Sequence, residues 1–185
     1  MKIVDFIFNY AIDPITSLPL MPSLTHWNWI LEKQWDKSDT FMLVTWPGEE
    51  ANEIGESFGE ELEDAQETGK RFFRGNLSDE LKVALKNVPE TGHLPWFEFH
   101  LFKDGESTLY VDIYGGTIVI WVEDDELDPI KKHIVNEEAI KDIMVTDPAQ
   151  TIPFEASELR SLEQELERMI REMGENPDLF NEEPN

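Results

Sequence analysis

Two acids and a histidine that could transfer protons lie within one strongly patterned stretch of the sequence. Residues 97–125 read FEFHLFKDGESTLYVDIYGGTIVIWVEDD and carry Glu98, His100 and Asp112 among apolar residues. If the three side chains meet in a cleft, two carboxylates and an imidazole can act as general acid and general base in a hydrolysis. Whether they meet depends on the register of the strands that carry them.

Patterns that could bind a metal or a phosphate are incomplete. The histidines have no close pair at the spacing of zinc ligands: they are His26, His93, His100 and His133. Asp124, Glu126 and Asp128 match the first three ligand positions of a calcium loop. Pro129, however, occupies the position where that loop requires glycine. There is no Gly-rich phosphate loop and no Cys, so we expect no metal, cofactor or thiol chemistry.

The alternation of residues 95–123 predicts a three-stranded antiparallel meander. Gly115-Gly116 is typical of a two-residue hairpin turn and would pair Val111 with Ile120. A three-residue turn at 103–105, ending in a left-handed glycine, would pair Phe99 with Leu109. The predicted core face is wholly apolar and comprises Phe97, Phe99, Leu101, Leu109, Val111, Ile113, Ile118, Ile120 and Val122. The predicted opposite face comprises Trp96, Glu98, His100, Phe102, Tyr110, Asp112, Tyr114, Thr117, Val119 and Trp121.

This opposite face has more than one interpretation. In the predicted register Glu98 and Asp112 are diagonal neighbours, at a separation that could suit acid–base catalysis. Any sheet with polar residues on one face produces such pairs, however. The face could instead be a second layer of core, or a contact surface, because Trp and Tyr are enriched at interface hot spots.

Other segments predict the elements that surround the meander. Strands are expected at residues 1–10 and 40–46, and helices at residues 23–35, 49–67, 76–88, 136–144 and 155–173. The last helix has an apolar stripe formed by Leu159, Leu162, Leu166, Met169 and Met173. The fold class is therefore α+β, a mainly antiparallel sheet with helices on one face, including the C-terminal helix. We expect one domain over residues 1–174 and an acidic, flexible tail over 175–185.

The balance of charges restricts the partners. Asp and Glu number 40 against 15 Lys and Arg, so the formal net charge is −25. Direct binding to nucleic acid or to an anionic membrane requires a basic surface, and the sequence contains no extended basic cluster. A basic protein would be attracted instead. Solubility alone, or adaptation to salt, would also account for the charge.

The sequence gives little sign of export. It has no Cys, no apolar run long enough for a signal core, and no stretch that could span a membrane. We therefore expect a cytoplasmic protein.

Together these observations favour an acidic, non-enzymatic protein-binding module. An inhibitor or immunity-type protein that neutralises a cationic toxin or nuclease fits this description by charge and size. The alternatives are a DNA mimic that acts on a nucleic-acid-binding protein and a small hydrolase that uses Glu98, His100 and Asp112. We expect a monomer, or a weak dimer through the C-terminal helix. The candidate partner-binding residues are Trp96, Glu98, His100, Tyr110, Asp112, Trp121, Glu60, Glu61, Asp124 and Asp125.

Overall fold

The protein is an α+β protein in which one large antiparallel sheet forms one layer and the helices pack against one of its faces. The structure, a computed structural model, describes residues 1–62 and 69–149. Within this part, the chain belongs to a compact unit that spans Met1–Pro148. The predicted helix at 155–173, the dimer contact assigned to it, and the predicted domain boundary at 174 lie outside the described residues.

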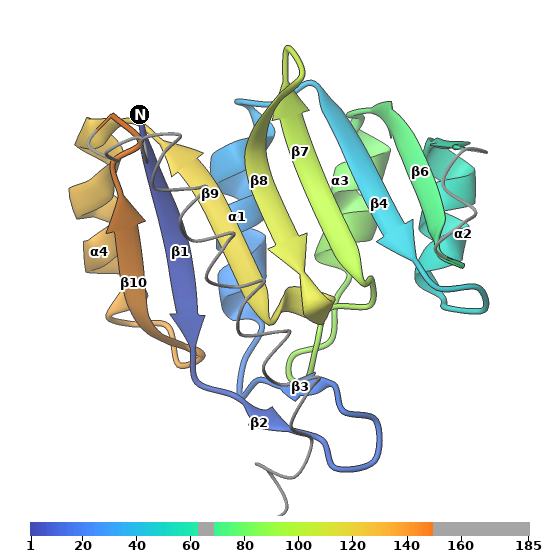
Figure 1. Cartoon of the computed structure of the whole chain (residues 1–185), viewed down its shortest axis with the longest axis horizontal. Coiled ribbons are helices and arrows are strands. Elements are labelled where there is room, and N and C mark those ends of the chain that lie inside the picture. The colour runs from blue at the N-terminus through green and yellow to red at the C-terminus, as the bar shows by residue number, and fades with distance from the viewer. Residues whose placement is uncertain (63–68, 150–185) are drawn as a thin grey trace, which may run out of the picture. The chain divides into compact units, whose positions relative to one another are not determined.

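Eight strands form the large sheet in the order β10-β1-β9-β8-β7-β4-β6-β5 (Figure 1). Their bounds are Lys2–Phe8 (β1), Thr40–Thr45 (β4), Glu60–Glu61 (β5), Arg71–Asn76 (β6), Glu98–Lys103 (β7), Glu106–Asp112 (β8), Thr117–Val122 (β9) and Ile140–Thr146 (β10). The short strands β2 (Ala11–Ile12) and β3 (Pro19–Leu20) form a separate hairpin. Strands β7, β8 and β9 are adjacent in the sheet, so the predicted meander is confirmed.

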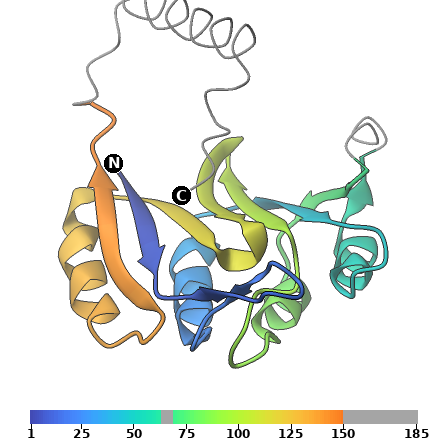
Figure 2. The same cartoon turned by 60° about the horizontal axis from the view of Figure 1, so that its bottom comes forward.

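The helices of the described residues all lie on one face of the sheet, as Figures 1 and 2 show. They are α1 (Thr25–Trp35), α2 (Ala51–Phe58), α3 (Asp79–Lys86) and α4 (Leu127–Ile134). Helix α3 begins where its sequence predicts, because the Ser78 hydroxyl accepts a hydrogen bond from the Leu81 N–H. Short 3-10 turns follow β8 (η2, Ile113–Gly115) and β9 (η3, Asp124–Glu126).

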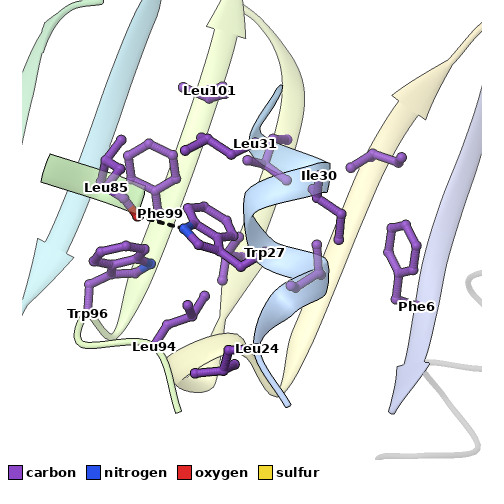
Figure 3. Packing of buried hydrophobic residues seen from close by; sticks show 14 of the residues in the cluster. Phe6, Leu24, Trp27, Ile30, Leu31, Leu85, Leu94, Trp96, Phe99 and Leu101 are labelled. Carbon is purple, nitrogen blue, oxygen red and sulfur yellow. Dashed lines mark hydrogen bonds between the residues drawn. The ribbon is translucent and has the colours of Figure 1, made fainter. Parts of the chain in front are cut away.

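Aromatic side chains join the helices to the sheet (Figure 3). The Trp27 ring of α1 lies 5.3 Å from the Trp96 ring and 5.9 Å from the Phe99 ring, centroid to centroid. All three side chains are fully buried. The Trp27 indole N–H donates a 2.7 Å hydrogen bond to the Leu85 carbonyl near the end of α3, so its buried polar group is satisfied. This cluster fixes α1 and α3 against the centre of the sheet.

The meander has the predicted faces but a different register. Phe99 pairs with Val111 rather than Leu109, and Val111 pairs with Ile118 rather than Ile120. The first turn is the two-residue Asp104-Gly105 turn, with positive φ at both residues, and a bulge beside Leu101 preserves the faces. A displacement of two residues keeps every side chain on its face. The predicted core residues that are buried are Phe99, Leu101, Leu109, Val111, Ile118, Ile120 and Val122.

At the ends of the meander, the predicted assignment of residues to the two faces is wrong. Trp96 is fully buried and Phe97 is only half-buried, so the prediction that Trp96 lies on the opposite face is wrong. Strand β7 begins at Glu98, and the alternation of a strand does not extend into the bend before it. Ile113, predicted to be core, is 49% exposed. It lies in the four-residue connection that replaces the predicted two-residue turn, where both Ile113 and Tyr114 have positive φ.

Two predicted helices are wrong in extent or type. The helix predicted over 49–67 ends at Phe58, because the chain turns at Gly59 to pair β5 with β6. A Cβ on Gly75 would lie 2.5 Å from the Phe58 carbonyl, so this close approach requires glycine.

The segment 136–144, predicted to be helical, contains most of the edge strand β10. Strand β10 pairs along β1, and this long-range pairing overrides the local preference of the segment. The helix of this region is α4 instead. The sequence features that indicate α4 are the Glu123–Glu126 capping box just before it, the acid in its first turn, and Lys131 and Lys132 in its last turn.

Candidate functional site

The face of the sheet opposite the helices, called here the second face, carries the predicted chemistry-bearing residues. One row of directly paired residues crosses the whole sheet on this face: Met144, Asp5, Val119, Tyr110, His100, Met42, Arg74 and Glu60. Beside this row, on the same face, lie Ile3, Trp121, Phe102, Glu98 and Asp112. None of the helices in the described part of the chain covers this face (Figure 1).

His100 occupies the centre of the second face in a largely apolar environment. Its side chain is only 16% exposed. The imidazole stacks on Phe102 with an interplanar angle of 2° and lies 4.8 Å from the Tyr110 ring. Burial lowers the pKa of His100, although Glu98 and Asp112 partly oppose this effect. The imidazole is therefore neutral at pH 7.

Glu98 meets His100 but is committed to a different partner. The Glu98 Oε2 atom lies 3.5 Å from His100 Nε2, which is too long for a normal hydrogen bond. Its Oε1 atom accepts a 3.0 Å hydrogen bond from the Lys70 ammonium group. The same ammonium group lies 3.9 Å from the centroid of the Phe97 ring. Glu98 is thus part of an ion pair, supported by an aromatic ring, at the start of β7.

Asp112 is also engaged locally. Its carboxylate accepts a 2.7 Å hydrogen bond from the Ile113 N–H, and this bond begins the η2 turn. Burial raises the pKa of the Tyr110 hydroxyl, and the neighbouring Asp112 raises it further. Tyr110 therefore stays protonated and neutral on the same face. The structure brings Glu98, His100, Tyr110 and Asp112 together, but in contacts that stabilise neutral or paired forms.

The other predicted acids do not join this cluster. Glu60 lies on the second face, but β4 and β6 lie between its strand and that of His100, and the three inter-strand spacings correspond to about 14 Å. Glu61 forms a hydrogen-bonded ion pair with Arg71. Asp124 and Asp125 lie in η3, which follows β9, and Asp124 Oδ1 lies 3.8 Å from Lys2 Nζ. The ten candidate residues therefore lie in several separate parts of the molecule and do not form one site.

Asp5 is a second-face residue that sequence reasoning missed. It pairs with Val119, and burial raises the pKa of its carboxyl group. The feature that could have identified Asp5 is the alternation of side chains between the two faces along residues 2–8. Val4, Phe6 and Phe8 are buried on the core face, which leaves Asp5 on the opposite face.

Three cavities in the surface of the described residues lie away from the Glu98 and His100 cluster. Their volumes are about 390, 560 and 300 Å³. The first lies between α2 and β6, the second between α4 and β10, and the third between α2 and α3. Among the described residues, no group of three or more His, Cys, Asp or Glu side chains could hold a metal ion.

Comparisons with protein-family models, with curated proteins and with solved structures found no match. In the part of the chain that the structure describes, no helix is long and apolar enough to cross a membrane. The protein is therefore classified by its fold and by the composition of its surface. It is an α+β protein with an antiparallel sheet, helices on one face and acidic and aromatic side chains on the other.

Proposed function

We propose that this chain is a non-enzymatic, acidic binding module that binds a basic protein through the second face of its sheet. The observation that carries the proposal is the composition of this face. On this face the half-buried ring of Tyr110 lies between the carboxylates of Glu98 and Asp112 at one end and the half-buried rings of Trp121 and Phe102 at the other, and no helix of the described residues packs over them. Aromatic anchors next to charges of one sign are typical of an interface for a partner of opposite charge.

The distribution of charge supports the same partner. Many basic side chains are already bound to acids of the same chain: Arg71 to Glu56 and Glu61, and Lys82 and Lys86 to Glu32. The remaining carboxylates carry the formal net charge of −25. Such an excess accelerates association with a basic protein, and salt weakens the effect. An inhibitor or immunity-type role, in which the module neutralises a cationic toxin or nuclease, fits this chemistry.

The contacts of Glu98 and His100 make the hydrolase hypothesis weaker. A general base must reach its proton at hydrogen-bond distance. Glu98 is paired with Lys70, and the neutral His100 imidazole lies between two aromatic rings. The DNA-mimic hypothesis needs a continuous ridge of carboxylates, whereas the candidate acids Glu60, Asp112 and Asp124 lie on separate elements.

The test begins with capture of partners from a native lysate at low salt, followed by titration of each captured protein after purification. We expect a basic protein whose affinity falls about 3- to 10-fold with Asp112→Asn and about 30-fold with Trp121→Ala. Asp112→Asn keeps a side-chain acceptor for the Ile113 N–H. The matched control is Glu80→Gln, which removes one charge from exposed α3 on the other side of the sheet. The proposal is refuted if Asp112→Asn and Glu80→Gln weaken binding equally.

A further inference from the structure

Helix α4 and the edge strand β10 border a groove that is lined by apolar and charged side chains. The cavity between them has a volume of about 560 Å³. Its lining consists of Lys131, Ile134, Val135, Ile140, Lys141, Asp142, Ile143 and Val145. Strand β10 is the outermost strand of the sheet, and β1 is its partner on the inner side (Figure 1). Within the described residues, the outer edge of β10 therefore has no strand partner.

Apolar side chains are exposed on both sides of the groove. Val135 at the end of α4 is 83% exposed, and Val145 on β10 is 36% exposed. Edge strands offer unpaired N–H and C=O groups to other chains, and most proteins protect them with charges, bulges or covering elements. A groove between an edge strand and a helix is the geometry in which an added peptide strand binds.

Three lysines lie at or beside the rim of this groove. Lys131, Lys132 and Lys141 are exposed, and none of them forms an ion pair with another described residue. Elsewhere, lysines such as Lys37 and Lys82 are paired with glutamates. Asp142 also lines the groove and offsets one of these lysines, so the lysines still outnumber the acid among these four residues. The rim is therefore locally basic in a chain whose formal net charge is −25.

We propose that the groove between α4 and β10 binds an extended, acidic segment of a partner protein. The segment adds to the outer edge of β10 as a further antiparallel or parallel strand. Its main chain bonds to the free edge, and its alternate apolar side chains enter the groove beside Ile134 and Ile143. Its carboxylates meet Lys131 and Lys141 at the rim. This site is separate from the second face, and its partner is acidic rather than basic. An experiment that refutes one of the two proposals therefore leaves the other untouched.

The binding test uses two fluorescein-labelled octapeptides, one that alternates valine with glutamate and one that alternates valine with lysine. Fluorescence anisotropy measures their affinity for the full chain. We expect the glutamate peptide to bind at least about 10-fold more tightly than the lysine peptide. Lys141→Glu should weaken the glutamate peptide about 5-fold or more. Lys33→Glu changes the net charge equally on the exposed side of α1 and should change the affinity less than 2-fold.

Hydrogen exchange locates the bound peptide. We expect the glutamate peptide to slow exchange of outward-facing amides of β10, and a peptide N-methylated at alternate residues to lose both binding and protection. The proposal is overturned if the glutamate peptide does not bind preferentially, if Lys141→Glu and Lys33→Glu have the same effect, or if protection lies elsewhere. It is also overturned if the free protein is a dimer by sedimentation with β10 amides already protected, because a second copy then occupies the edge.

Discussion

Lowering the pH should destabilise the protein through His26, a histidine buried in the core. His26 lies at the start of α1, is fully buried, and has its ring 5.1 Å from the Phe8 ring. Burial lowers its pKa from 6.5 to about 4, and a backbone contact at Ser23 opposes this shift only in part. The folded protein therefore contains a neutral imidazole that becomes protonated on unfolding at mildly acidic pH.

The sign and size of the effect follow from linkage. Because the pKa is lower in the folded state, the contribution to stability is complete above pH 6.5 and is lost as the pH falls toward 4. The free energy of unfolding should fall by about 2 kcal/mol between pH 7.5 and pH 5, and by about 3 kcal/mol at pH 4. Asp5 acts in the opposite direction, because burial raises its carboxyl pKa.

The assay is urea unfolding followed by tryptophan fluorescence at pH 7.5, 6 and 5, for the wild type and for His26→Leu. Asp5 is common to both proteins, so its contribution cancels in the comparison. The wild type should lose about 2 kcal/mol more than His26→Leu over this range. His93→Gln, a histidine substitution outside the core cluster, is measured alongside as the control. Equal losses for the wild type and His26→Leu would refute the assignment of the acid sensitivity to His26.

Four further substitutions test the packing and the contacts of the site. Trp27→Phe should lower the free energy of unfolding by about 1–3 kcal/mol in urea titrations, because it leaves the Leu85 carbonyl without its donor. Gly75→Ala should cost at least about 2 kcal/mol and shift the thermal midpoint downward, since its Cβ would lie 2.5 Å from the Phe58 carbonyl. Gly116→Ala, with its nearest contact at 3.1 Å and no positive φ, should cost less. Lys70→Met should lower the free energy of unfolding by about 1 kcal/mol in urea titrations, because it removes the ammonium group that pairs with the Glu98 carboxylate.

The sequence could predict the faces of the central strands but not their register. Leu109, Val111, Ile118 and Ile120 alternate so regularly that only one face can be buried. The register depends on the turns, and two turns of different length are compatible with the same faces when they differ by two residues. Neither the bulge beside Leu101 nor the left-handed Ile113 and Tyr114 has a local sequence signal.

The candidate site was predictable in part for the same reason. Glu98, His100, Tyr110 and Asp112 share a face because of their parity, and the structure brings them together. The ion pair of Glu98 with Lys70 joins residues that are 28 positions apart, so no local sequence pattern predicts it. It changes the interpretation of Glu98 from a free carboxylate to a paired one.

The failure at β10 has a physical meaning beyond the error in secondary structure. Residues Asn136–Met144 contain acids, Lys and Ala, which favour helix when local propensity decides. The segment becomes a strand only because β1 offers an edge, and it is itself left as an edge. Local preference and global fold thus disagree at the place where apolar side chains and unpaired lysines are exposed together. Such disagreements concentrate at functional sites in natural proteins, which gives the groove between α4 and β10 an argument independent of its charge.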